Sequence, residues 1–284
     1  MIKLKRLLFS LLFLINTLLN LFIIQGDCSQ NPNNREKKLG DILKKCSDYC
    51  EKLAQSSLFF VCEETIEEKM FGYNYYSNRS IYTTRNPNKI DKNTYLYDYQ
   101  LIKKGNKIEE RRILLEENGK QKYEENAELK TKRFFSRRPI FGPVGLLRKD
   151  SQELYDYTIL KEDTLEGRKV FVLETKPKTK MKNRPSYGKI WIDKEDSSIL
   201  KIETEEESLV GYDILSKKAK KQGLSPILKI AHYYYTKEKG LRFPSMTLFE
   251  EAYSGAKLKG KKIKSTTIIT HNNYRFFTVE VEVK

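Results

Sequence analysis

Apolar and polar residues alternate along most of the chain after Met70, with the two-residue period of β-strands. The run TYLYDYQLI, residues 94–102, sets three tyrosines and a leucine on one face. Turn residues interrupt such runs at Asn118-Gly119, at Glu166-Gly167 and at 194–197. Asn-Gly is the strongest short hairpin signal, since both residues tolerate positive φ. The pattern therefore predicts consecutive antiparallel hairpins.

Residues 232–253, HYYYTKEKGLRFPSMTLFEEAY, predict two more strands joined by 237–240. Such a concentration of aromatic rings fills the solid core of a sandwich or lines the apolar hollow of a curved sheet. A one-residue shift in register inverts the set of side chains that faces inward. The sequence therefore does not determine which of the two sets of alternate side chains on these strands faces inward.

Hairpins without intervening helices imply one meandering antiparallel sheet. A sheet of so many strands curls or closes, because large twisted sheets do not stay flat and open edges invite aggregation. No repeat or low-complexity linker divides the chain, so we expect a single domain over residues 37–284.

The segment from Leu39 to Leu53 has apolar residues and cysteines at helical spacing, which predicts an amphipathic helix that covers the hollow side of the sheet. Cys46 and Cys50 lie one turn apart on the same face of this helix, and Cys62 follows it. In an exported chain these cysteines favour oxidation over metal binding. A Cys50–Cys62 disulfide is predicted, with Cys46–Cys62 and three unpaired buried thiols as the alternatives.

Residues 133–147, RFFSRRPIFGPVGLL, mix arginines and apolar residues around two prolines and two glycines. This composition is typical of a loop that acts as a lid or plug, or of a long connection packed on the core.

The N-terminus predicts export. Lys3, Lys5 and Arg6 precede an apolar run, residues 7–24, in the pattern of a secretory signal. Residues 1–27 are interpreted as a signal peptide, or as an N-terminal anchor through 7–24, because no A-x-A cleavage site is visible. Cys28 offers a lipid anchor, although Asp27 stands where a small uncharged residue is usual.

The formal charge is +16, and lysines gather in three basic loops, at 176–184, at 216–223 and at 255–264. Nucleic acid is not expected as a partner of an exported protein, whereas an anionic membrane surface is the nearest large polyanion. Solubility is the alternative role for these lysines. The lysines predicted to face a membrane are Lys178, Lys180, Lys182, Lys217, Lys218, Lys220 and Lys221.

The sequence predicts no enzyme. It contains no P-loop, dinucleotide-binding or EF-hand pattern. His232 and His271 have no nucleophile motif nearby and are interpreted as satisfied surface or edge side chains. No cofactor and no metal are expected.

Several motifs resemble a known family. YGKIWIDKEDSSILKIE, residues 187–203, is similar to a hairpin of the periplasmic lipoprotein carriers and receptors of the LolA/LolB type and of their sensor relative RseB. GLRFPS and the strand after it fit the same family. YCEKLAQSSLFFVCEE, YLYDYQLI and FGPVGLL resemble uncharacterised exported bacterial proteins of this fold.

The resemblance implies a mainly β (α+β) fold, a strongly curved antiparallel half-barrel covered by the N-terminal helix and a loop or helical lid. Its apolar cavity would hold lipid or lipoprotein acyl chains in the periplasm. An RseB-like envelope-stress sensor, which contacts an envelope membrane protein, is the alternative. The residues expected to line the cavity or its lid are Tyr97, Phe134, Phe141, Leu146, Trp191, Tyr233, Tyr235, Phe243 and Phe249.

Overall fold

The structure is a computed structural model. It describes residues 32–56, 59–71, 90–104, 107–133, 142–179, 186–258 and 260–277. The chain forms two compact units, Met1–Asp41 and Ile42–Lys284. In the first unit the described residues form the beginning of helix α2, and the contacts below all belong to the second unit. No helix in the described ranges is both long and apolar enough to span a bilayer.

The described helices are α2 (Pro32–Ser56), α3 (Gly142–Leu147), α4 (Lys149–Gln152), α5 (Tyr212–Lys220) and the 3-10 turns η2 (Glu206–Ser208) and η3 (Ala256–Leu258). The first strands are β1 (Phe59–Phe71), β2 (Ile90–Lys104), β3 (Lys107–Glu117), β4 (Lys120–Glu124), β5 (Tyr155–Leu165), β6 (Arg168–Pro177) and β7 (Gly188–Asp193). They are followed by β8 (Ile199–Thr204), β9 (Ser225–Tyr233), β10 (Thr236–Glu238), β11 (Leu241–Phe243), β12 (Met246–Ser254) and β13 (Lys262–Phe276).

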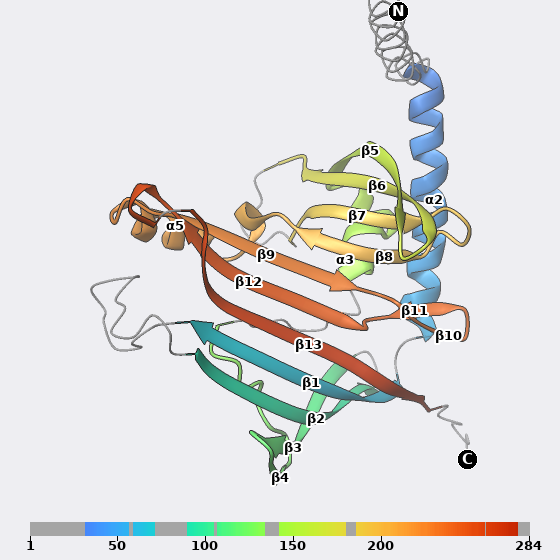
Figure 1. Cartoon of the computed structure of the whole chain (residues 1–284). Helices are drawn as coiled ribbons and strands as arrows, with labels where there is room; N and C mark the ends of the chain where they lie inside the picture. The colour runs from blue at the N-terminus through green and yellow to red at the C-terminus, as the bar shows by residue number, and fades with distance from the viewer. Residues whose placement is uncertain are drawn as a thin grey trace, which may run out of the picture. The chain divides into compact units, whose positions relative to one another are not determined.

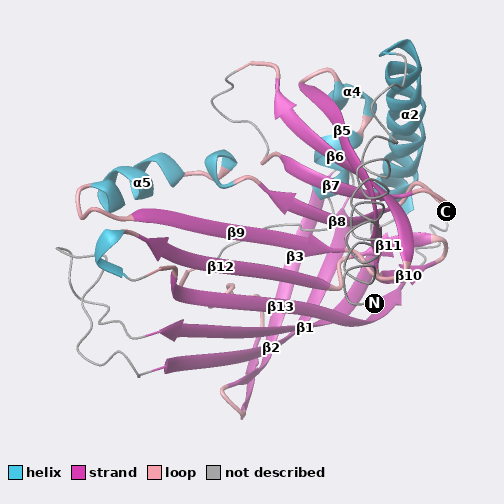
Figure 2. Cartoon of the chain, turned by 45° about the horizontal axis from the view of Figure 1, so that its top comes forward, coloured by secondary structure: helices cyan, strands magenta, loops and turns pink. Residues whose placement is uncertain are grey.

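Eleven strands form one antiparallel sheet in the order β4-β3-β2-β1-β13-β12-β9-β8-β7-β6-β5. Two meanders, β1 to β4 and β5 to β9, are joined because β13 pairs with β1 on one side and with β12 on the other. The sheet curves, so that its two ends bend out of the plane of the middle strands (Figures 1 and 2). The predicted mainly β fold with a curved antiparallel sheet is confirmed.

The predicted hairpin turns are confirmed at Asn118-Gly119 and Glu166-Gly167. Asn118 and Gly119 have φ of 51° and 76°, and Glu166 and Gly167 have 48° and 74°. Positive φ at both central residues matches the right-handed twist of the flanking strands. The local sequence therefore determines these turns.

The run 232–253 differs from the expected single hairpin. β10 and β11 form a separate two-stranded sheet, whereas β9 pairs directly with β12, with Tyr233 opposite Met246. Pro244 follows β11 and has no N–H to donate to a ladder, so the short hairpin ends there and the chain rejoins the main sheet.

The predicted amphipathic helix is confirmed as α2. Its buried hydrophobic residues in the second unit are Ile42, Cys46, Tyr49, Cys50 and Leu53.

Two basic or irregular segments contain helices that the sequence did not predict. Residues 216–223, predicted as a basic loop, belong largely to α5, where Leu215 and Ala219 pack on Leu224 and Tyr253. Residues 142–147 of the predicted lid form α3.

Candidate functional site

One face of the sheet, here called the inner face, can be followed from strand to strand by register. Ile66 on β1 stands opposite Ile269 on β13, and this row continues through Thr247 and His232 to Ile202 on β8. Residues opposite each other in antiparallel strands project to the same side. The alternate residues of these strands form the outer face.

Helices cover the inner face at the β5–β8 end. A Cβ atom built on Gly142 in α3 would lie 3.4 Å from Cδ1 of Ile202 on the inner face. The hydroxyl of Tyr157 on β5 donates a hydrogen bond to the carbonyl oxygen of Leu146 in α3. α3, which lies in the segment expected as a loop or helical lid, therefore covers this end of the inner face.

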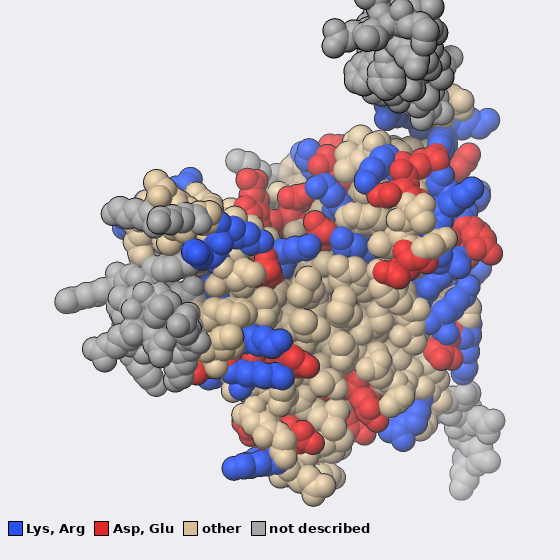
Figure 3. All heavy atoms as spheres, viewed as in Figure 1, with Lys and Arg blue, Asp and Glu red and all other residues tan. Residues whose placement is uncertain are grey.

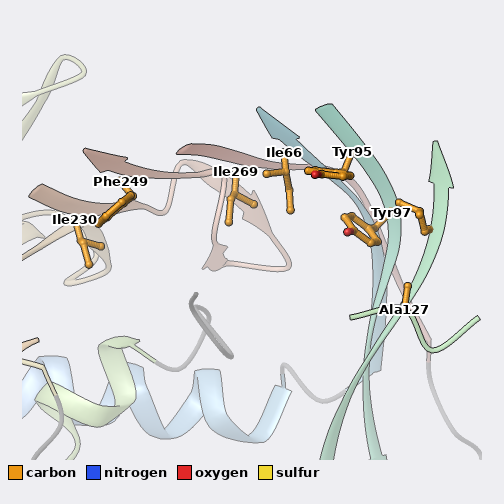
Figure 4. Close-up of a cluster of buried hydrophobic side chains, with 8 residues drawn as sticks. Ile66, Tyr95, Tyr97, Ala127, Ile230, Phe249 and Ile269 are labelled. Atoms are coloured by element: carbon orange, nitrogen blue, oxygen red, sulfur yellow. The ribbon is translucent and has the colours of Figure 1, made fainter. Parts of the chain in front are cut away.

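The remaining inner face carries a cluster of buried apolar side chains, here called the apolar cluster. It extends over the adjacent strands from β3 to β9 and takes in part of the segment after β4. In Figure 4 the labelled sheet side chains project from the same side of the sheet, toward α2 and α3. The cluster consists of Ile66, Tyr95, Tyr97, Leu114, Ala127, Ile230, Phe249 and Ile269, with Leu129, Leu209 and Leu228 packed against it.

Residues 127–133, here called the strap, cross the inner face. The Tyr97 hydroxyl donates to the carbonyl of Glu128 and accepts from the backbone N–H of Lys130, both at 3.3 Å. The backbone N–H groups of Lys132 and Arg133 donate to Oε1 of Glu68 on β1, at 2.9 and 3.1 Å. The strap therefore spans from β2 to β1 over the apolar cluster.

The far end of the strap is held by an ion pair between Arg133 and the buried carboxylate of Glu251. The Arg133 guanidinium donates to Glu251 on β12, with Nε 2.8 Å from Oε2. Burial alone would raise the pKa of Glu251, but the hydrogen bond from Arg133 and the charge of Lys264 outweigh it, and the pKa is lowered. Tyr253 donates a further hydrogen bond to the same carboxylate, at 2.7 Å.

A second buried polar group lies on the inner face next to the apolar cluster. Arg112 on β3 donates to Glu64 on β1 through Nε–Oε1 at 2.6 Å and Nη2–Oε2 at 3.0 Å. His271 Nε2 lies 3.1 Å from Glu64 Oε2. Burial opposes ionisation of Glu64, but the hydrogen bonds from His271 and Arg112 outweigh it and lower its pKa to about 2.

The structure brings Tyr97 and Phe249 together, since both belong to the apolar cluster. Phe243 is buried elsewhere, in an aromatic group with Phe60, Tyr274 and Phe276 at centroid distances of 4.7–6.0 Å.

Three residues of the predicted cavity lining belong to the segment 133–147 that was predicted as a lid. Leu146 is buried in α3, and Phe134 and Phe141 lie outside the described residues.

Trp191 and the tyrosines at 233 and 235 are not brought to the apolar cluster. Tyr233 stands opposite Lys201 on β8 and Met246 on β12. These two residues are next in sequence to Ile202 and Thr247 of the inner face, so Tyr233 projects from the outer face. The Lys201 ammonium lies 4.2 Å from the Trp191 ring centroid and 5.6 Å from that of Tyr233. Tyr235 packs with Trp191 against Val170, Val172 and Leu200. Tyr234, between these tyrosines, is the fully buried member of the three.

The structure corrects the disulfide prediction, because Cys46, Cys50 and Cys62 are free and buried. Cys50 Sγ lies 3.5 Å from the carbonyl oxygen of Pro143 in α3, and Cys46 Sγ lies 3.9 Å from that of Ser197 in the β7–β8 turn. The cysteine face of α2 thus contacts α3 and a turn rather than Cys62 on β1. Burial raises the pKa of all three thiols, that of Cys46 to about 12.

Charged side chains surround an uncharged central area on the side of the molecule seen in Figure 3. At one end of the sheet, the lysines of α5 and its C-cap, Lys217, Lys218, Lys220 and Lys221, are exposed. Val210 and Ile214 are exposed beside them, the latter at 57%. Lys178, exposed after β6, lies in another part of the chain, and Lys180 and Lys182 fall outside the described residues.

A pocket of about 490 Å³ lies between the C-terminal end of α2 and the region of α4. Charged residues dominate its lining, namely Glu51, Arg148, Lys149, Asp150 and Glu153, with Ala54 and Gln55. Within the described ranges, no group of three His, Cys, Asp or Glu residues is placed to hold a metal ion.

The sequence reasoning missed the polar part of the inner face. His271 was predicted as a surface or edge side chain, yet it is 2% exposed and lies at the centre of the face. The strand FFVCEETIEEKMF carries glutamates at 63, 64, 67 and 68, so its alternation does not separate a dry face from a wet one. Only the register with β13 places Glu64 beside His271.

A family model described only as an uncharacterized protein matches residues 145–219. No curated protein matches the chain.

Similar solved structures include a DUF1329 family protein from Desulfovibrio piger. It is 13% identical to this chain, the match covers 82% of this chain and 92% of that protein, and the TM-score is 0.37. A LolA superfamily protein from Nitrosomonas europaea is 11% identical over 85% of this chain and 94% of that chain, with a TM-score of 0.35. An outer membrane lipoprotein-sorting protein domain from Vibrio parahaemolyticus is 13% identical over 84% and 94%, also with a TM-score of 0.35. Proteins of the LolA superfamily are thus among the structures to which this chain is similar, as the sequence resemblance predicted.

Proposed function

We propose that this protein is a non-enzymatic binding protein of the periplasm that holds lipid or lipoprotein acyl chains against the apolar cluster. The observation that carries the proposal is the continuity of the cluster over adjacent strands, from Leu114 on β3 to Ile230 on β9. Each methylene of a bound chain that leaves water for such a surface contributes about 0.8 kcal/mol. A long acyl chain therefore needs no polar contact to bind here.

The strap supplies the route by which the cluster becomes available. Ala127 and Leu129 of the strap pack on the cluster in this structure. Residues 127 and 129 thus occupy apolar surface that an acyl chain takes over when it binds. The strap is attached at Tyr97, Glu68 and Glu251 through polar contacts that are separate from the strand pairings of the sheet, so the strap can leave while the sheet stays intact.

Docking on an anionic membrane belongs to the same proposal. The exposed lysines at the α5 end have no ion-pair partner in the part of the chain that the structure describes, and Val210 and Ile214 stand exposed next to them. Lysines near an anionic surface contribute about 1 kcal/mol each, and apolar side chains insert at the headgroup boundary. Residues 1–27 are part of the proposal as the export signal. The mass of the purified protein tests this, because cleavage of the signal lowers it.

The test compares two adjacent residues of β13. Ile269 belongs to the apolar cluster, whereas Ile268 projects from the outer face. We expect Ile269→Thr to weaken the binding of a fluorescent fatty acid several-fold and Ile268→Thr to leave it unchanged. Native mass spectrometry of the wild-type protein should also show retained lipid. Absence of retained lipid together with equal, negligible binding by all three proteins would refute the proposed function.

A further inference from the structure

A row of polar side chains borders the apolar cluster on the inner face. Glu68 on β1 stands opposite Asn93 on β2 and Thr267 on β13. Each of the three has one buried atom without a hydrogen-bond partner in the described part of the chain: Oε2 of Glu68, Nδ2 of Asn93 and Oγ1 of Thr267. Glu68 and Thr267 are 0% exposed. Unpartnered buried polar atoms are rare in native proteins because they cost free energy, and three in one row point to a missing partner.

The row and the apolar cluster are contiguous. The next inner-face row along the same three strands consists of Tyr95, Ile66 and Ile269, all members of the cluster. Successive residues on one face of a strand lie about 7 Å apart. A ligand with its chain on the cluster therefore has its polar end within reach of the row.

Glu68 differs from the other two buried glutamates of the inner face. Glu64 is paired with Arg112, and Glu251 with Arg133. Glu68 accepts two backbone N–H groups at Oε1, but within the described residues its Oε2 has no hydrogen-bond partner. Buried carboxylates are rarely left without a positive partner, because the charge is then poorly solvated.

We propose that the Asn93–Glu68–Thr267 row binds the protonated primary amine of an amphiphile whose chain lies on the apolar cluster, an inference that rests on the proposed function. The ammonium group has three N–H donors, which can serve Oε2 of Glu68 and Oγ1 of Thr267. The Asn93 amide N–H then donates to an acceptor oxygen beside the amine. A quaternary ammonium has the same charge but no N–H, so it leaves the row unsatisfied.

The test compares two soluble phospholipids that differ only in this group. Dihexanoylphosphatidylethanolamine and dihexanoylphosphatidylcholine are titrated into the full mature protein by calorimetry. We expect the wild type to prefer the ethanolamine lipid by about tenfold or more, the range of a charge-assisted hydrogen bond. Glu68→Gln should reduce this ratio to about one. Glu67→Gln, the same change on the outer face of β1, should keep it.

A second variant separates binding from folding. Thr267→Val removes the unpartnered hydroxyl at nearly constant volume, so we expect the protein to melt at a higher temperature while its preference for the ethanolamine lipid falls. Decylamine and decyltrimethylammonium form the second pair of ligands. If the protein prefers the primary amine in both pairs of ligands, the row recognises the amine alone. If it prefers the primary amine only in the phospholipid pair, the row recognises the amine together with the phosphate.

Different results would refute the amine site and the proposed function. If the wild type binds both phospholipids equally, or if Glu68→Gln and Glu67→Gln have the same ratio, the amine site is refuted and acyl-chain binding stands. If the wild type binds none of the four ligands, both the amine site and the proposed function are refuted.

Discussion

Replacing Glu64 by glutamine tests whether the buried polar group of the inner face stabilises the fold. Glu64 accepts hydrogen bonds from Arg112 at 2.6 and 3.0 Å and lies 3.1 Å from His271 Nε2. The side chains of Glu64, Arg112 and His271 are 2%, 10% and 3% exposed. The variant keeps the shape of the side chain but leaves the buried guanidinium without a counter-charge.

Two lines of reasoning predict the magnitude of the loss. Removing one partner of a buried ion pair costs about 3–5 kcal/mol. Independently, the pKa of Glu64 is lowered from its ordinary value of 4.5 to about 2, since hydrogen bonds from His271 and Arg112 outweigh burial. A lowering of the pKa by this amount corresponds to about 3 kcal/mol. We therefore expect the free energy of unfolding to fall by about 3 kcal/mol at pH 7.

The same pKa predicts a pH dependence. A carboxylate with a lowered folded-state pKa stabilises the fold above its ordinary pKa, and this contribution is lost as pH falls from about 4.5 toward about 2. The difference between wild type and Glu64→Gln should thus shrink to about half near pH 3.

The assay is urea unfolding followed by intrinsic fluorescence at pH 7, 5 and 3. Glu63→Gln is the matched control, because Glu63 is exposed on the outer face and accepts one hydrogen bond from Asn273. It should change stability by less than about 0.5 kcal/mol. A loss below about 1 kcal/mol for Glu64→Gln at pH 7, or an equal loss at pH 7 and pH 3, would refute the reasoning.

Three further predictions concern a glycine, the thiols and the basic helix. A Cβ atom on Gly188 would lie 2.0 Å from the carbonyl oxygen of Glu203, so Gly188→Ala should lower the free energy of unfolding in urea by several kcal/mol. Gly145→Ala is the control and should cost less than about 1 kcal/mol, because a Cβ atom there has open space around it. The three buried thiols should resist iodoacetamide at pH 8 and react fully in urea, because burial raises their pKa values; mass spectrometry that finds them alkylated in the native protein would contradict this. Lys217→Glu with Lys218→Glu should lower binding to phosphatidylglycerol vesicles at least about tenfold in a sedimentation assay, because each lysine contributes about 1 kcal/mol, and an unchanged affinity would remove α5 from the docking surface.

Local signals in the sequence were sufficient for many elements of the fold. The turns at Asn118-Gly119 and Glu166-Gly167 follow from residues that tolerate positive φ, and α2 follows from apolar residues at helical spacing. The short helix α5 escaped prediction because its lysines dominate the local composition, while its few apolar residues show their role only against Tyr253 on β12.

The cysteines show where local reasoning stops. Helical periodicity places Cys46 and Cys50 on one face of α2, and both are buried. What that face meets depends on where α3 and the β7–β8 turn fold, about a hundred residues or more away in the chain. The disulfide prediction failed at this step.

The sequence by itself determined that this chain folds as a curved antiparallel sheet with an amphipathic helix, because hairpin turns, strand alternation and helical spacing act between residues close in the chain. Only the tertiary structure decided which residues share the inner face. Glu64 and His271 are 207 positions apart, and they meet because β13 returns to pair with β1. A shift of one residue in that pairing would send Glu68 and Thr267 to opposite faces. Register between distant strands is set by the packing of the whole sheet, so the candidate site could not be read from any one stretch of sequence.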